Sequence, residues 1–232
     1  MKAQRLRIRY RITPAALGLG QRDTVDALVQ AFTAAGLPIA RSQGKRESAL
    51  ISLAAPLPQG VTSDGELADV FLSEVVRPAE ALRRVAAAAR PGIEIIGLEE
   101  IGVGSPSLQS QLRWAEYEAR IPANALSEAG VQERIDSLLS SRSHAAEYKR
   151  EKKTRTYDLR PLIQDITLEG VDEGGFRLRL MLRAEQENTA RADETIAALG
   201  LPAPLAVHRR RLRVEEIPAV VQAFRAAGER ER

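Results

Sequence analysis

Hydrophobic and polar residues alternate strictly at the start of the chain. Between positions 5 and 12, every even residue is apolar and every odd residue is arginine. A period of two predicts a half-buried β-strand whose apolar side faces a core. After Asp23 the apolar residues recur at helical spacing until Gly36 and Pro38 end the helix. Further along, the pattern predicts strands at 39–53, 67–75 and 93–103, a helix from Pro78 to Pro91, and a shared core containing Leu6, Ile8, Val25, Leu28 and Phe32.

The order β-α-β-β-α-β over the first hundred residues is that of the ferredoxin-like unit, in which two helices cover one face of an antiparallel sheet. The order starts again after a linker at 102–107, with a helix capped by Asn124 or Ser127 and a long, polar, extended stretch at 144–166. We therefore predict an α+β fold of two tandem ferredoxin-like (βαββαβ) units with antiparallel sheets. The first unit spans 1–104, the second spans 105–216, and an amphipathic helix or tail occupies 217–232.

The composition is that of a globular protein and excludes several kinds of site. The 232 residues are 44% hydrophobic and 28% charged, and 34 Lys and Arg against 31 Asp and Glu give a net charge of only +3. Cysteine is absent, which excludes disulfides and cysteine-held zinc or iron–sulfur clusters. With only two histidines, we predict no metal and no cofactor. No stretch resembles a signal peptide or a membrane span, so a cytoplasmic protein without membrane contact is expected.

Sequence motifs give no indication of catalysis. Gly18-Leu19-Gly20 lacks the third glycine of a dinucleotide-binding loop, and the sequence contains no phosphate-binding loop and no nucleophile elbow. His144 and His208 are interpreted as surface residues. We predict no catalytic residues.

Rows of arginines on the predicted strands suggest a binding surface. On an open sheet face they would contact phosphates, and the segment 142–160 adds seven Lys and Arg against three acidic residues. However, aromatic residues make up only 4% of the chain, too few for a base-stacking platform. The alternative is that the arginines are solvated strand residues paired with nearby glutamates. The candidate nucleic-acid-binding residues are Arg5, Arg7, Arg9, Arg11, Arg177 and Arg179.

Three strings carry a resemblance to a known family. They are RSQG at 41–44 followed by AAPLPQG at 54–60, DLRPLI at 158–163, and R-x-D-E at 191–194. With them the chain resembles the DUF2344 family, radical-SAM-associated proteins of uncharacterised function, from about Arg5 to Glu215. The family-motif residues that match here are Asp23, Arg41, Ser42, Gln43, Gly44, Asp158 and Arg160. Lys45 belongs to the same family-motif loop but stands where the family pattern has phenylalanine.

The resemblance implies an accessory module whose radical SAM partner, encoded nearby or fused in relatives, holds the cluster. Two histidines of the family pattern are replaced, by Gln21 and Ser48. We expect Arg41, Gln43 and Lys45 to border a concave surface between the two units, because domain junctions are favoured binding places.

Three functional hypotheses follow. The first is a non-catalytic accessory module that presents a substrate, with RNA as the favoured substrate, to a radical SAM protein. The alternative is a protein–protein scaffold with no nucleic-acid role. The third is an enzyme acting on a small anionic substrate near Arg41 and Gln43.

Overall fold

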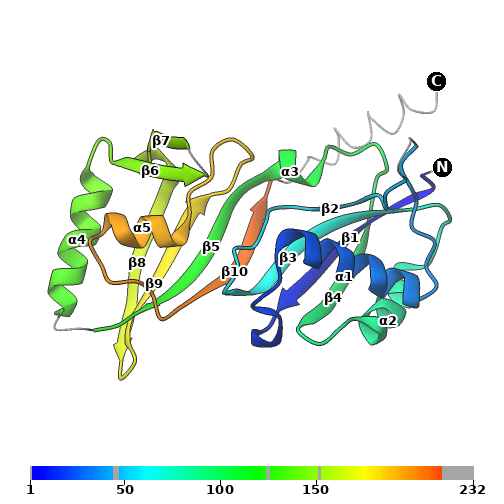
Figure 1. The fold of residues 1–232 in the computed structure, drawn as a ribbon, viewed down its shortest axis with the longest axis horizontal. Helices are drawn as coiled ribbons and strands as arrows, with labels where there is room; N and C mark the ends of the chain where they lie inside the picture. Colours follow the sequence, from blue (N-terminus) through cyan, green and yellow to red (C-terminus); the bar gives the residue numbers. More distant parts are fainter. Residues whose placement is uncertain (1, 44–46, 124–125, 151–152, 216–232) are drawn as a thin grey trace. The chain divides into compact units, whose positions relative to one another are not determined.

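A computed structural model describes residues 2–43, 47–123, 126–150 and 153–215 of the chain. These residues form a mixed α+β fold, which confirms the predicted class, and they divide into two compact units (Figure 1). Unit 1 comprises the described residues up to Leu112 together with 214–215, and unit 2 comprises Arg113–Arg213. No helix in the described part of the chain is long and apolar enough to cross a membrane.

Unit 1 has the predicted order of elements. After β1 (Gln4–Ile12) and the 3-10 turn η1 (Pro14–Ala16) come α1 (Gln21–Ala34), β2 (Ile51–Leu53), β3 (Val61–Leu72), α2 (Pro78–Ala88), β4 (Ile93–Ile101) and the short α3 (Leu108–Gln111). The strands lie in the order β4-β1-β3-β2, and each neighbouring pair is antiparallel. The second strand is much shorter than the predicted 39–53, because only isolated bridges at Ile39 and Arg41 precede it.

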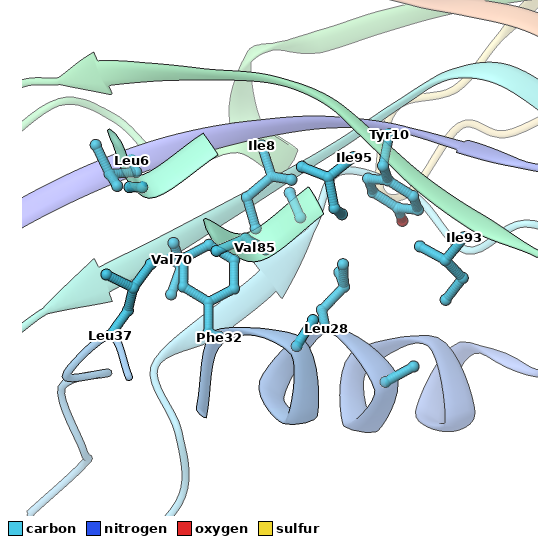
Figure 2. Packing of buried hydrophobic residues seen from close by; sticks show 14 of the residues in the cluster. Leu6, Ile8, Tyr10, Leu28, Phe32, Leu37, Val70, Val85, Ile93 and Ile95 are labelled. Carbon is cyan, nitrogen blue, oxygen red and sulfur yellow. The ribbon is translucent and has the colours of Figure 1, made fainter. Parts of the chain in front are cut away.

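The core of unit 1 lies between this sheet and its two long helices (Figure 2). Leu28 and Phe32 of α1 are fully buried against Leu6 and Ile8 of β1, as the periodicity predicts. Val25 is only partly buried and packs at the margin of this cluster. The apolar alternation of β1 is thus explained by one buried side of the strand.

Unit 2 contains the same order of strands with one insertion. Its elements are β5 (Leu112–Ile121), α4 (Glu128–Ser140), β6 (Ala145–Arg150), β7 (Lys153–Asp158), the turn η2 (Arg160–Leu162), β8 (Ile163–Asp172), β9 (Gly175–Arg183), α5 (Ala192–Ala198) and β10 (Ala206–Val214). The main strands lie in the order β10-β5-β9-β8, whereas β6 and β7 form a separate two-stranded hairpin. The polar stretch predicted at 144–166 is therefore this hairpin followed by the beginning of β8.

Local sequence explains how several of these elements begin. Ser127, one of the two predicted caps, is the N-cap of α4, and its Oγ accepts the Gly130 N–H at 3.1 Å. At the start of β9, Gly175 has φ 119°, and a Cβ built there would lie 2.0 Å from the Ile121 carbonyl oxygen. Only glycine fits this turn. Asn124 and the predicted tail at 217–232 lie outside the described residues.

Candidate functional site

Two arginines of the β1 row are buried around one carboxylate. Arg5 and Arg7 are 3% and 7% exposed, and Asp69 of β3 is 1% exposed. Arg7 Nε donates to Asp69 Oδ1 at 2.9 Å, and Arg5 Nη2 donates to Oδ2 at 2.6 Å. Arg5 also donates to the carbonyl oxygens of Ser105 and Pro106, at 2.6 and 2.8 Å. This burial differs from the expected open row, because Asp69 lies directly opposite Arg7 in the strand register and holds both guanidinium groups inside the fold.

The other two arginines of β1 are exposed. Arg11 lies 3.7 Å from both Asp64 and Glu94, with close to half of its side chain in solvent. Arg9 is exposed and makes no ion pair with any residue that the structure describes. Within this row, Arg9 is therefore the arginine best placed for an external anion.

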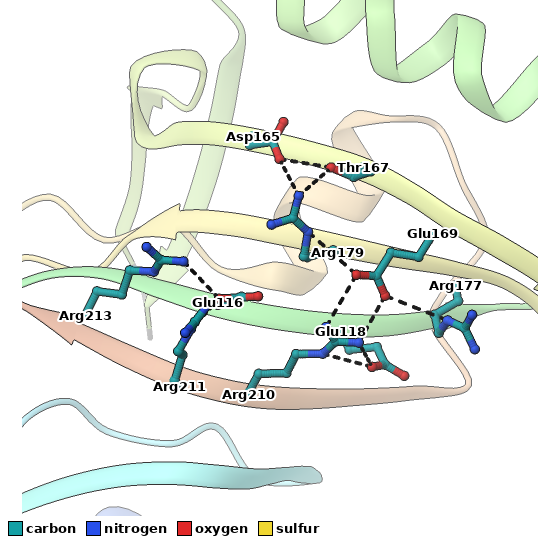
Figure 3. A network of polar contacts seen from close by, with 10 residues as sticks. All are labelled: Glu116, Glu118, Asp165, Thr167, Glu169, Arg177, Arg179, Arg210, Arg211 and Arg213. Carbon is teal, nitrogen blue, oxygen red and sulfur yellow. Dashed lines mark hydrogen bonds and ion pairs between the residues drawn. The ribbon is translucent and has the colours of Figure 1, made fainter.

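Arginines and carboxylates interlock along the strands of unit 2 in a set that we call the charge lattice (Figure 3). Arg210 of β10 contacts Glu118 at 2.5 Å and Glu169 at 3.0 Å, so it joins β5 to β8 across β9. Arg179 of β9 contacts Asp165 at 3.2 Å and Glu169 at 3.6 Å. The members of the charge lattice are Arg177, Arg179, Arg210, Arg211 and Arg213 with Glu116, Glu118, Asp165 and Glu169.

The least exposed acid of the charge lattice is Glu116, which accepts hydrogen bonds from Arg211 at 2.6 Å and from Arg213 at 3.4 Å. Burial raises the pKa of this carboxyl, but the hydrogen bonds and positive charges of the two arginines outweigh burial and lower the pKa below its ordinary value. The pKa of Arg210 is raised, mainly by its hydrogen bond to Glu118. The five arginines and four carboxylates of the charge lattice are therefore mutually paired, as the alternative interpretation of the arginine rows requires.

Asp23 and the loop of the first family-like string have local structural roles. Asp23 Oδ2 accepts the Gly20 N–H at 2.9 Å and so completes the N-terminus of α1. Ser42 and Ser48 are joined through their hydroxyl groups at 3.0 Å, which closes the loop. Arg41 and Gln43 are exposed. Gly44 and Lys45 lie outside the described residues, and the expected concave surface around this loop stays a prediction.

Tyr157, which directly precedes the second string, contacts Glu194 of the third string, although 37 positions separate the two residues in the sequence. The Tyr157 hydroxyl donates a short hydrogen bond to the Glu194 carboxylate of α5. Burial, followed by this bond and the negative charge of Glu194, raises the pKa of Tyr157 well above its ordinary value. Arg191 pairs with Asp193 at 2.8 Å and lies 3.7 Å from Glu194. Burial raises the pKa of Asp193, but the Arg191 bond and charge outweigh it and lower the pKa.

The matched pair of the second string has bonding roles at a chain reversal. Asp158 Oδ1 accepts the backbone N–H of His144 at 2.8 Å and that of Arg160 at 3.1 Å. The Arg160 side chain donates to the Leu139 carbonyl at 2.6 and 3.0 Å, and to the Ile163 carbonyl at 2.8 Å. Asp158 and Arg160 therefore fix the base of the β6–β7 hairpin to the end of α4, and they do not pair with each other through side chains.

An open hollow of about 640 Å³ lies in unit 2 beside this junction. It is lined by α4, by the end of α5 and by His144, with Leu138 and Leu199 among its apolar side chains. Arg134 at its edge donates to the Leu199 and Gly200 carbonyls, at 3.2 Å each, and so satisfies the end of α5. His144 lines this hollow. The sequence alone predicted a surface position for His144 but did not predict the hollow.

Sequence reasoning also missed Asp69, Glu118 and Glu169, the acids that hold the arginines. Glu118 lies on the polar side of an alternating strand, so the pattern predicts its side but not its partner. A partner from another strand depends on register, which the alternation of a single strand does not specify.

The fold and these sites define an α+β protein with a mostly antiparallel sheet, whose strand arginines are largely paired with carboxylates. A family model described as "Uncharacterized protein conserved in bacteria (DUF2344)" matches residues 5–192. The match covers most of the chain, so the chain belongs to this family, as the three strings indicated. No curated protein matches the sequence.

Several solved structures are similar to this chain over about half of their own length. The "Crystal Structure of a Cbf5-Nop10-Gar1 Complex" matches with a TM-score of 0.49 at 12% identity, over 89% of this chain and 48% of that chain. The "Structure of H/ACA RNP bound to a substrate RNA containing 2'-deoxyuridine" matches with a TM-score of 0.43 at 13% identity, over 90% and 46%. Similarity at this level carries no functional argument.

Proposed function

We propose that the chain is an accessory module that docks on a radical SAM protein through a surface of fixed, alternating charge. We infer further that it consists of two tandem ferredoxin-like units, the second carrying the β6–β7 hairpin as an insertion. The shared strand order, with the first strand between the fourth and the third, supports this fold. Membership of the DUF2344 family supports the link with a radical SAM partner through the resemblance described above.

The observation that carries the docking proposal is the charge lattice. Its five arginines and four carboxylates leave a net charge of +1, so this surface does not attract a polyanion strongly. Charges held at fixed positions provide register and partner choice when they meet a complementary protein surface. The geometry therefore favours the protein–protein role over RNA binding by the strand arginines.

The experiment is a pull-down of the radical SAM protein encoded nearest to this chain, with nuclease present so that RNA cannot bridge the two. The key variant exchanges the partners Glu118→Arg and Arg210→Glu. The exchange preserves net charge and an ion pair within the chain, but it inverts the charge pattern that the partner meets. We expect about tenfold or greater loss of affinity, because like charges are brought together.

The matched control exchanges Arg11→Glu and Glu94→Arg, an exposed pair in unit 1 whose charged groups lie 3.7 Å apart. It should leave the complex unchanged. Failure of the unmodified chain to bind the radical SAM protein would refute the docking proposal. Equal binding by both exchanged variants would show that the charge lattice is not the docking surface.

RNA presentation is the second candidate function. The observation that favours it is Arg9 of β1, which is exposed and makes no ion pair with any described residue.

A further inference from the structure

The strand face that carries the charge lattice continues to the only tryptophan of the chain. Trp114 lies two positions before Glu116 on β5, so both side chains lie on the same face of the strand. The register places Arg183 of β9 opposite Trp114, and Met181 opposite Glu116. Residues directly opposite each other in an antiparallel pair share a face. One end of this face therefore brings together a tryptophan, a methionine and an arginine beside the least exposed acid of the charge lattice.

Arg183 stacks on Trp114 at this end of the face. The guanidinium carbon lies 4.9 Å from the centroid of the indole ring, within the range of a cation–π contact. Stacking uses the flat side of the planar guanidinium group, so its N–H groups remain directed outward from its edges. The pair therefore combines an apolar ring with a set of hydrogen-bond donors in a fixed plane.

The donors of Arg183 are only partly used within the fold. Among the described residues, Arg183 donates from Nη1 alone, to Glu185 at 3.4 Å. Its Nε is shielded from solvent and has no acceptor in the described part of the chain. Nε and Nη2 form an edge that a carboxylate can bind in a bidentate manner. Native proteins satisfy nearly all shielded donors, because an unsatisfied one costs free energy, so this edge indicates a position for an external acceptor.

The positive excess of the face lies at the same end. About half of the side chains of Arg211 and Arg213 is exposed, and both arginines share one carboxylate, that of Glu116. With Arg183 and Glu185, three positive charges stand against two negative charges here. Along the rest of the face, the other three arginines of the charge lattice meet its other three carboxylates. The excess of one positive charge is therefore local to the tryptophan end.

We propose that Trp114 and Arg183 form the anchor of the docking surface and bind an aspartate or glutamate side chain on an acidic segment of the radical SAM protein. This inference rests on the docking proposal and names the chemistry of the partner. Tryptophan, methionine and arginine are enriched at protein interfaces, and a few anchors of this kind carry most of the binding energy. The carboxylate meets the Nε–Nη2 edge after a rotation of the Arg183 side chain, which is 35% exposed.

A single carboxylate fits this site better than a nucleic acid does. One side of the indole ring is already stacked by Arg183, whereas proteins that bind single strands stack bases on their aromatic rings. A local excess of one charge balances one carboxylate, but it is small for a phosphate backbone.

The first test uses the isolated full chain, in which Trp114 is the only source of tryptophan fluorescence. The probe is an oligoglutamate peptide, with an oligoglutamine peptide of the same length as the neutral control. Single-stranded RNA of mixed sequence is titrated in parallel. We expect a saturable change in fluorescence with oligoglutamate and none with oligoglutamine. Arg183→Gln should weaken the affinity for oligoglutamate about tenfold or more, because hydrogen bonds to a charged group are lost.

A second variant separates binding from folding. Arg213→Gln removes a charge from a side chain that is about half exposed, so it should keep the melting temperature and weaken the affinity for oligoglutamate about two- to fivefold. The matched control is Arg90→Gln, the same charge change at an exposed position of unit 1, which should bind like the unmodified chain.

The second test is the nuclease-treated pull-down with Trp114→Ala. Loss of the anchor should lower the affinity for the radical SAM protein about tenfold or more. The matched control is Val75→Ala, which truncates an exposed apolar side chain of unit 1 and should leave the complex unchanged.

Three results of the titration would overturn the inference. They are no response to oligoglutamate, equal affinity of the Arg183→Gln variant and the unmodified chain, and tighter binding of RNA than of oligoglutamate. Equal pull-down by the Trp114→Ala and Val75→Ala variants would also overturn it, but docking through the charge lattice would stand. A chain that binds oligoglutamate and not the radical SAM protein would refute the docking proposal and leave the carboxylate site in place.

Discussion

The buried carboxylate of Asp69 offers the sharpest test of how unit 1 is held together. Asp69 lies between Arg5 and Arg7, and it accepts four hydrogen bonds from them at 2.6 to 3.2 Å. Asp69→Asn preserves the shape of the side chain but removes its charge. The two guanidinium groups then remain buried with no anion among their bonded partners. Of the two arginines, only Arg5 also donates to the carbonyl oxygens of Ser105 and Pro106, so Arg7 loses more of its hydrogen bonding than Arg5 does.

Breaking a buried ion pair by removing one partner destabilises a protein by about 3–5 kcal/mol. For a chain of this length, each kcal/mol lowers the melting temperature by about 2–4 °C, so Asp69→Asn should lower it by about 6–20 °C. Replacing all three residues by apolar side chains, as in Arg5→Met, Arg7→Met, Asp69→Leu, should recover much of this loss. The reason is that the variant leaves no charge buried.

The assay is thermal unfolding followed by circular dichroism and calorimetry, with Asp64→Asn as the matched control on the same strand. Asp64 is more than half exposed and lies 3.7 Å from Arg11, so its replacement should change stability by less than about 1 kcal/mol. If Asp69→Asn melts within about 2 °C of the unmodified protein, the view that this carboxylate compensates two buried charges is wrong.

Three further outcomes are expected. The pKa of Glu116 is lowered in the folded protein. Its contribution to stability is therefore present above the ordinary pKa of 4.5 and is lost as pH falls through the folded pKa. Glu116→Gln should make the free energy of unfolding fall less steeply at acid pH. Tyr157 has a raised pKa, so its contribution to stability holds below pH 10 and is lost as pH rises through the folded pKa. Absorbance titration should show a tyrosine ionisation above the ordinary range, and Tyr157→Phe should remove that step. Gly175→Ala should lower the melting temperature by several degrees, because its Cβ would overlap the Ile121 carbonyl.

The apolar pattern predicted the parts of the fold that have one buried side. β1 and α1 have strong periods because Ile8, Leu28 and Phe32 face one core, and burial of that kind is visible in a single segment. The β6–β7 hairpin has polar residues on both faces, so it has no apolar period and was predicted only as an extended polar stretch. The hairpin is fixed by the hydrogen bond between Tyr157 and Glu194, which an amphipathic pattern does not reveal.

The candidate site was harder to predict because it depends on pairs of residues. The rows of arginine are visible in the sequence, but Arg7 meets Asp69 across 62 positions and Arg210 meets Glu118 across 92. The strand register therefore decides whether a row of arginines lies opposite carboxylates or remains without them. In this chain the arginines of the main sheet strands are largely internal partners of carboxylates.

The same pairs explain how the strands choose one register among those that bury the same side. Moving β1 by two residues along β3 would keep Leu6, Ile8 and Val70 on the buried side, so apolar alternation alone does not exclude it. The shift would place Arg7 opposite Leu67 or Phe71 in place of Asp69, and a buried guanidinium group would lose its anion. The ion pairs thus add to the fold the specificity that a uniform apolar stripe lacks.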